Sequence, residues 1–239
     1  MAYHDLLPIV LRDEIVFPDV EDALEEPNGL LAVGGDLSRE RLLLAYHKGI
    51  FPWFSKPDPI IWWSPDPRAV LYLEQLKVSR SLGKSIRNRN YQIWINKDFN
   101  QVIQGCAAAR AYSDETWITD EMLLAYQDLH QYGAAHCLSV YQDGQLVGGL
   151  YGISEGRFFF GESMFSTATD ASKVALYYLV QFLKSYDFLM IDCQVPNEHL
   201  TSLGSTQITR NEFIQQLEKW RDWPQPESMW QPREITENE

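Results

Sequence analysis

The pattern of apolar and polar positions divides the chain into an irregular first third and a regular remainder. In the first third, short aromatic runs alternate with prolines, which prevent long helices or strands. One helix is expected there, from the capping Ser38 to Lys48, with Gly49 as its stop. The next segment predicts strands at 69–73 and 91–95 and helices at 79–89, 98–110 and 120–132, the last capped by Thr119.

The second half follows a clear strand-and-helix pattern. HCLSVYQ, the turn Asp143-Gly144 and QLVGGLYGI predict a hairpin, and the turn at Glu155-Gly156 adds RFFFGESMF as the third strand of an antiparallel meander. Asp170 is expected to cap a helix to about Ser185, followed by the strand FLMIDCQV, a short helix at 197–204 and a last helix capped by Thr209. This order predicts an α+β fold, a mixed sheet with helices on both faces.

Two of these strands carry polar groups. Because side chains alternate along a strand, Asp192 and Gln194 share one face and Cys193 points to the other. A carboxylate beside an amide at a strand end is either structural or catalytic. Strict alternation along RFFFGESMF gives two sets of residues, Phe158, Phe160, Glu162 and Met164 on one face and Phe159, Gly161, Ser163 and Phe165 on the other.

Glu162 has two readings. A carboxylate within a buried run is costly unless paired, so it is either a satisfied structural group or a polar group inside a pocket. Gly161 would allow a ligand to approach the backbone. The tryptophans of FPWFSKPDPIIWW are core residues or platforms for a ring, and core is the more frequent outcome.

Composition narrows the function. The three cysteines fit no zinc or disulfide framework, so we expect reduced thiols; the histidines show no metal-ligand spacing, and no nucleotide-binding glycine motif occurs. We therefore expect no metal and no cofactor. The N-terminus does not read as a signal peptide, and no apolar run approaches the ~20 residues of a membrane helix, which predicts a cytoplasmic protein without a membrane partner.

The net charge of −13 argues at first against a nucleic-acid partner. Most of it, however, lies at the two ends: residues 1–40 carry −8 and residues 212–239 carry −4. Residues 75–97 contain six bases and no acid. This stretch is either a solvated helix face or a surface for phosphates.

The meander followed by a helix resembles the acetyl-CoA-dependent N-acetyltransferase fold. That family cradles a pyrophosphate in a glycine-containing loop, whereas residues 166–169 here contain no glycine. The fold is therefore expected without the coenzyme. A coenzyme A-dependent acetyltransferase stays open as a rival, as does a tRNA-binding module without catalysis.

Longer motifs resemble a bacterial family. FPDVEDALEEPNGLLAVGGDLSRERLLLAYHKGIFPWF, WWSPDPR, TWIT, GGLYG, FFFGESMFS, ASKVAL and IDCQ run in order and are similar to the leucyl/phenylalanyl-tRNA–protein transferases. The resemblance implies a small N-terminal domain, placed at 1–66, and an N-acetyltransferase-like catalytic domain at 67–239. It implies transfer of Leu or Phe, and Met less well, from aminoacyl-tRNA to proteins with N-terminal Arg or Lys. Such proteins enter N-end rule degradation; no DNA partner is expected.

The resemblance also assigns roles by motif. Asp192 and Gln194 match the proposed catalytic pair, and Glu162 and Asn197 match residues that orient the reacting groups. The positions matching contacts to the 3′-terminal adenosine are Tyr46, Trp53 and Trp117. Those matching the aminoacyl pocket are Leu150, Phe159, Gly161, Met164 and Leu176. With tRNA implied, the bases expected at its backbone are Lys77, Arg80, Lys84, Arg87 and Arg89.

The implied chemistry needs no ATP, because the donor ester is already activated. Asp192 would act as a general base or attract the cationic N-terminus, and Gln194 would relay the proton or hold the attacking nitrogen. An alternative is that the tRNA 2′-hydroxyl shuttles the proton.

Overall fold

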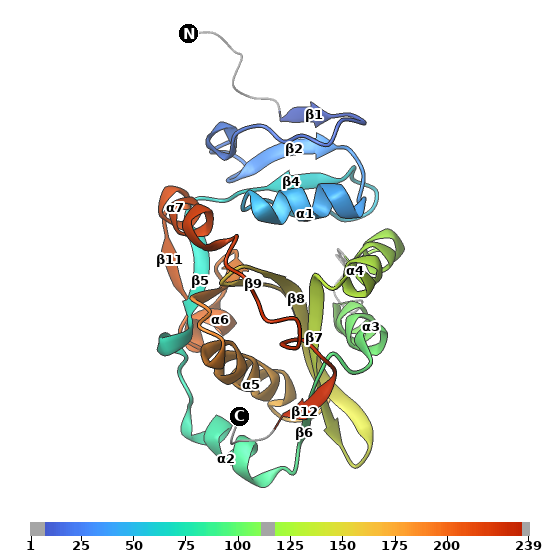
Figure 1. Cartoon of the computed structure of the whole chain (residues 1–239), viewed down its shortest axis with the longest axis vertical. Helices are drawn as coiled ribbons and strands as arrows, with labels where there is room; N and C mark the ends of the chain where they lie inside the picture. The colour runs from blue at the N-terminus through green and yellow to red at the C-terminus, as the bar shows by residue number, and fades with distance from the viewer. Residues whose placement is uncertain (1–7, 111–117, 236–239) are drawn as a thin grey trace.

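The computed structural model describes residues 8–110 and 118–235, which form two β-sheets (Figure 1). The smaller sheet has the order β1-β2-β4-β3. Its strands are β1 (Ile9–Leu11), β2 (Leu30–Gly34), β3 (Phe51–Pro52) and β4 (Ile61–Trp63). Helix α1 (Arg39–His47) lies between this sheet and the rest of the molecule.

The larger sheet has eight strands in the order β11-β5-β10-β9-β8-β7-β6-β12. They are β5 (Arg68–Tyr72), β6 (Gln92–Ile95), β7 (Ala135–Gln142), β8 (Gln145–Glu155), β9 (Phe158–Ser166), β10 (Met190–Gln194), β11 (Thr206–Ile208) and β12 (Arg233–Ile235). Of its pairings within the described residues, β9 with β10 is parallel and the others are antiparallel. The sheet is therefore mixed, as the sequence predicts.

Helices cover both faces of this sheet. Helices α3 (Phe99–Arg110) and α4 (Asp120–Tyr132) pack on one face, and α5 (Ala171–Ser185) packs on the other. The remaining helices are α2 (Arg80–Asn88), α6 (Glu198–Ser202) and α7 (Arg210–Trp220). The core on the α3/α4 side continues into the small sheet through Tyr46 and Trp62, whereas the α5-side core includes Phe159 and Leu176. This arrangement confirms the α+β class with a small N-terminal part.

Local chemistry explains most elements. The turn at Asp143-Gly144 has φ values of 51° and 75°, which fits the predicted two-residue hairpin. Thr119 and Thr209 accept the expected capping hydrogen bonds from Met122 and Glu212. The prediction that Asp170 caps α5 is correct in position but wrong in chemistry. Its side chain makes no cap bond and accepts instead from Ser85 and Lys173.

The alternation predicted along β9 is wrong beyond Gly161. The register with β8 shifts between Tyr151 and Gly152, so that Glu162 is the extra residue of a β-bulge. The bulge moves Met164 to the α5 side, with Phe159, and Phe165 to the α3/α4 side. Phe159, Gly161 and Met164 can therefore line one pocket, although strict alternation places Met164 on the opposite face from the other two.

The border between the two parts stays a prediction. The smaller sheet ends at Trp63 and the larger one begins at Arg68, and we propose the domains 1–66 and 67–239 on that basis. Within residues 8–110 and 118–235, no helix combines the length and the apolar character that a membrane-spanning helix needs.

Candidate active site

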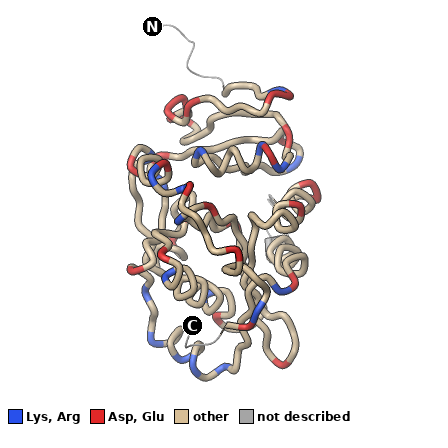
Figure 2. The backbone as a smooth tube through the Cα atoms, viewed as in Figure 1, with Lys and Arg blue, Asp and Glu red and all other residues tan. Residues whose placement is uncertain are grey.

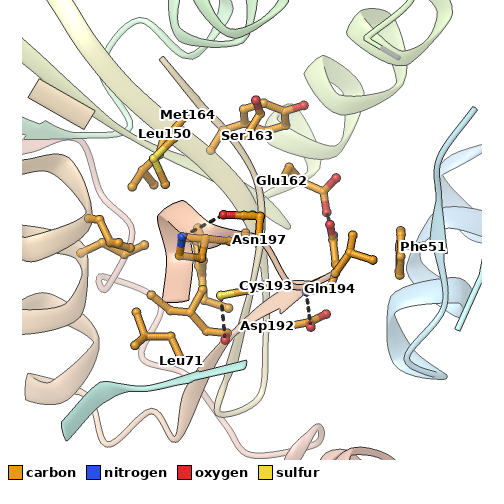
Figure 3. Close-up of a pocket in the computed structure, with 18 of the residues that line it drawn as sticks. Phe51, Leu71, Leu150, Glu162, Ser163, Met164, Asp192, Cys193, Gln194 and Asn197 are labelled. Atoms are coloured by element: carbon orange, nitrogen blue, oxygen red, sulfur yellow. Dashed lines mark hydrogen bonds between the residues drawn. The ribbon is translucent and has the colours of Figure 1, made fainter. Parts of the chain in front are cut away.

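A pocket of about 260 Å³ opens where β9 and β10 separate (Figure 3). Their parallel pairing ends at Phe160 and Asp192, and the strands diverge beyond it. The deeper wall is apolar and is formed by Leu71, Leu150, Phe159, Met164, Leu176 and Ile191. The polar side chains that line the pocket include Glu162, Asp192 and Gln194 at the divergence and Asn197 at the start of α6. The structure thus brings the predicted catalytic, orienting and pocket residues to one place.

Glu162 lies behind the polar wall in a network of hydroxyl groups. Its Oε1 accepts from the Tyr46 hydroxyl at 2.8 Å and its Oε2 from the Tyr126 hydroxyl at 3.0 Å. The two tyrosine hydroxyl oxygens also lie within hydrogen-bond distance of each other. Burial raises the pKa of Glu162 to about 7 despite these donors, and the negative charge of Asp192 adds to that rise. Glu162 therefore changes protonation near neutral pH.

Asp192 is fully buried beside Arg68. Nε of Arg68 donates to Oδ1 at 2.9 Å and Nη2 donates to Oδ2 at 2.7 Å, which is a two-point ion pair. The guanidinium lies between the rings of Phe51 and Phe213, at 4.8 and 4.7 Å from their centroids. Each charge thus has its counter-charge in direct contact, and the pair holds β5 against β10.

Gln194 connects the two carboxylates. Its backbone N–H donates to Oδ1 of Asp192 at 2.9 Å, and its Nε2 donates to Oε1 of Glu162 at 2.9 Å. A register shift after Asp192 gives Gln194 a φ of +63°. This bulge directs the amide side chain across the divergence toward Glu162, as Figure 3 shows.

Cys193 points away from the Asp192–Gln194 pair, as alternation predicts, and lines the α5 side of the pocket. Burial raises the pKa of its thiol, so the thiol stays protonated and is a poor nucleophile. Gly161 is in ordinary contact distance of Ile191 even with a Cβ added, so packing does not require glycine there. The close approach of a ligand to the backbone is then the remaining explanation for a glycine at position 161.

The predicted adenosine contacts are in different environments. Trp53 lines the pocket with an indole that is 43% exposed, whereas Trp62 is fully buried, so the core reading suits Trp62 and not Trp53. Tyr46 is fully buried behind Glu162, and its role at adenosine stays an untested prediction. Trp117 lies outside the described residues. Asn197 caps α6 through Leu200 N at 2.8 Å and lies at the rim of the pocket.

Sequence reasoning missed Arg68 and Tyr126. Arg68 belongs to the motif WWSPDPR, yet its partner is 124 positions away. Tyr126 sits on a helix whose buried face gives no sign that one hydroxyl meets Glu162. The signal for Arg68 in the sequence is its position, since a basic residue there stands at the start of an apolar strand. Within the described ranges, 8–110 and 118–235, His, Cys, Asp and Glu do not gather into a group that would hold a metal ion.

The predicted basic residues lie together on and beside α2, at the end of the molecule opposite the small sheet (Figure 2). Lys77, Arg80, Lys84 and Arg87 are exposed, and Arg89 is half-buried. Arg80, Lys84 and Arg87 follow helical spacing and share one face. A hydrogen bond of 2.8 Å from Ser85 to Asp170 joins α2 to the start of α5.

A buried carboxylate, an amide and an apolar pocket at the split of a mixed sheet form a site suited to a group-transfer enzyme with an apolar substrate. Two family profiles match the chain: "Leucyl/phenylalanyl-tRNA protein transferase" over residues 70–218 and its N-terminal domain over residues 35–66. Among curated relatives, the leucyl/phenylalanyl-tRNA–protein transferase of Pseudomonas aeruginosa is 53% identical over 219 residues, covering 92% of this chain and 97% of the relative. The Pseudomonas entomophila enzyme is 54% identical with the same coverage. This chain belongs to the leucyl/phenylalanyl-tRNA protein transferase family and is an aminoacyltransferase, which confirms the resemblance.

Comparison with solved structures gives lower similarity. FemX matches with a TM-score of 0.45 and 10% identity, covering 75% of this chain and 71% of that chain. The L-PGS of Bacillus licheniformis matches with a TM-score of 0.40 and 12% identity, covering 70% of this chain and 54% of that chain. A ribosomal-protein-alanine N-acetyltransferase from Brucella melitensis biovar Abortus 2308 matches with a TM-score of 0.33 and 15% identity, covering 56% of this chain and 96% of that chain.

Proposed function

We propose that this chain transfers Leu or Phe, and Met less well, from aminoacyl-tRNA to the α-amino group of proteins with N-terminal Arg or Lys. The product would enter N-end rule degradation in the cytoplasm. The relatives' names support the reaction class. The observation that carries the proposal is the hydrogen bond of Gln194 to Glu162 at the lining of a largely apolar pocket.

The apolar pocket takes the aminoacyl side chain. Leu, Phe and Met all have an unbranched Cβ. Their apolar side chains match the aliphatic and aromatic residues that line the pocket. A methylene in such a pocket changes binding by about 1–3 kcal/mol, so these three are separated modestly. We expect Val and Ile to be rejected sterically, because they branch at Cβ, where Leu, Phe and Met do not.

The reaction is the attack of a neutral amine on the ester carbonyl. A C–N bond forms, the C–O bond to the terminal ribose breaks, and the ribose oxygen leaves with the proton lost by the amine. The amine has an ordinary pKa of about 7.7–8.0, so a fraction is neutral at pH 7 without a strong base. Positioning and charge stabilisation are then the main contributions of the protein.

We assign those contributions to three residues. Gln194 holds the attacking nitrogen with its amide oxygen, because its Nε2 is committed to Glu162. Glu162 orients the amide and adds negative charge beside the cationic acceptor. Asp192 has no oxygen without a donor, so it acts by fixing Gln194 rather than by taking a proton.

The tRNA end would occupy the rim and the basic surface. Trp53 offers an exposed ring for the terminal adenosine, and Asn197 lies at the same rim. Lys173 is linked both to the pocket and to α2: after burial, its charge lowers the pKa of His199 at the pocket, and it pairs with Asp170, which accepts from Ser85 of α2. The exposed bases of α2 are the side chains that we propose to contact phosphates.

One assay tests the proposal. Labelled Leu-tRNA is mixed with the protein and a peptide with N-terminal Arg, and label in the peptide is measured. We expect labelling that disappears when the peptide's α-amino group is acetylated. A tRNA-binding module without catalysis would retain Leu-tRNA and leave the peptide unlabelled. A coenzyme A-dependent acetyltransferase would instead bind acetyl-CoA in calorimetry and label the peptide only from that donor.

A further inference from the structure

The chain after α7 crosses the molecule to its opposite edge. We call residues 222–235 the C-terminal strap; they follow the part matched by the family profile, which ends at residue 218. Gln225 Nε2 donates to Ser154 Oγ and to the carbonyl of Gly156, both at 2.8 Å, which ties the strap to the β8–β9 turn. The strap ends in β12, which pairs with β6 at the sheet edge (Figure 1).

Met229 and Ile235 of the strap are buried in the α5-side core, and the half-buried Trp230 packs against it. Its ring stacks on His136 at 4.0 Å with an interplanar angle of 4°, and meets Phe182 of α5 at 5.0 Å. Its Nε1 donates to Gln225 Oε1 at 3.1 Å, and its carbonyl accepts from Asn96 Nδ2 at 2.6 Å. Ring stacking, the hydrogen bond of the indole N–H and the hydrogen bond of the Trp230 backbone carbonyl thus hold the indole in one orientation.

The indole also contacts Phe159, at 5.9 Å between ring centroids. Phe159 is fully buried and forms part of the apolar wall of the pocket. Its ring also lies against Gly152, where an added Cβ would come within 2.6 Å of it. Phe159 is therefore held between the pocket and two rigid supports, Gly152 and Trp230.

We propose that Trp230 is a specificity-determining residue that acts through Phe159. By supporting Phe159 from behind, Trp230 sets how far that ring extends into the pocket and so how large a side chain the pocket accepts. It is a positioning residue, because it does not line the pocket. This inference rests on the proposed function, since it concerns the choice between Leu and Phe.

The experiment compares kcat/KM for Phe-tRNA and Leu-tRNA with an Arg-terminated peptide. Trp230→Leu removes part of the support, so Phe159 recedes and the pocket deepens. A deeper pocket accommodates the larger Phe side chain better, so we expect the ratio of kcat/KM for Phe-tRNA to that for Leu-tRNA to rise roughly threefold to tenfold. Trp230→Phe keeps a ring in place and should shift the ratio less, in the same direction. It replaces Trp230→Leu in the test if that variant does not fold.

Two controls separate pocket shape from general loosening. Ile235→Ala weakens the strap at β12, which β6, β7 and β8 separate from β9, so it should leave the ratio unchanged. In a Phe159→Leu background, Trp230→Leu should no longer move the ratio, because the ring it positions is absent. An unchanged ratio in Trp230→Leu and Trp230→Phe, or an equal shift in Ile235→Ala, overturns the inference. Wild-type protein that transfers neither amino acid contradicts the proposed function instead.

Discussion

Arg68 and Asp192 form a two-point ion pair between strands β5 and β10, and neither side chain is more than 1% exposed. Asp192 Oδ1 also accepts from the backbone N–H of Gln194. Both oxygens of the carboxylate therefore accept hydrogen bonds within the protein. The pair fixes the position of β10 at Asp192, and the carboxylate in turn holds the backbone of Gln194.

Substitutions at Asp192 separate positioning from base catalysis. Asp192→Asn keeps an oxygen for the Gln194 N–H, so we expect turnover within about tenfold of wild type and an unchanged pH profile. Asp192→Ala leaves a buried guanidinium unpaired, and the free energy of unfolding should fall by about 3–5 kcal/mol. Urea denaturation and single-turnover transfer with saturating Leu-tRNA measure both effects. Equal losses of about a hundredfold or more in both variants would instead identify Asp192 as the base.

Glu162 should give the reaction a pH dependence near neutrality. Its pKa is about 7, so the carboxylate that holds Gln194 is present above that pH and is lost as pH falls through it. Transfer by wild type should therefore decline from pH 8 to pH 6 more steeply than transfer by Glu162→Gln, whose amide does not titrate. The acceptor amine, with a pKa of about 7.7–8.0, contributes equally to both profiles.

A matched variant checks the assignment. Tyr126→Phe removes one donor to Glu162, so the pKa should rise further and the decline should begin at higher pH. Profiles that coincide for wild type, Glu162→Gln and Tyr126→Phe would show that Glu162 does not titrate in the working range.

The same carboxyl group links folding stability to pH. Its pKa is raised from 4.5 in the unfolded chain to about 7 in the folded protein, so the folded state holds the proton more tightly. The stability that the proton supplies is complete below pH 4.5 and is lost as pH rises through 7, a cost of about 3 kcal/mol. The free energy of unfolding of Glu162→Gln, measured by urea denaturation and compared with that of wild type, should therefore rise by about that amount between pH 5 and pH 8. A difference that is constant with pH would contradict this.

The sequence predicted what depends on local pattern. Helices α3, α4 and α5 and the meander β7–β9 follow from periodicity and turn chemistry, and their bounds agree with the structure. The small sheet was missed because its strands have two to five residues and lie among prolines. The bulge at Glu162 was missed because one extra residue in a strand changes no local composition.

The site itself was predicted through the resemblance, and its internal contacts were not. The residues that meet Glu162 come from α1, α4 and β10, separated from it by 116, 36 and 32 positions. A hydroxyl on a buried helix face carries no mark of which strand it will contact. The pairing of Arg68 with Asp192 is of the same kind, since only the folded sheet brings the two together.

Trp53 should contribute to binding of the terminal adenosine. Stacking of a base on an aromatic side chain is worth about 1–3 kcal/mol, so Trp53→Ala should weaken binding of Leu-tRNA roughly fivefold to hundredfold. Trp223→Ala is the matched control, because its indole is 46% exposed, close to the 43% of Trp53, and lies away from the pocket. With tRNA lacking its terminal adenosine, wild type and Trp53→Ala should bind equally; a persisting difference would place the contact elsewhere.

The exposed bases of α2 should determine how binding of tRNA responds to salt. Each phosphate contact contributes a slope of about −0.7 to −0.9 in log K against log salt, and the few bases available predict a total of roughly −2 to −4. Replacing Arg80, Lys84 and Arg87 together by Ala should weaken binding and reduce that slope by about 2 to 3. Lys219→Ala on α7, compared with Lys84→Ala, controls for the loss of one positive charge. The acidic ends of the chain repel nucleic acid in general, and α2 lies in the stretch of residues 75–97 that contains no acid. A slope unaffected by the triple variant would mean that the tRNA backbone follows another surface.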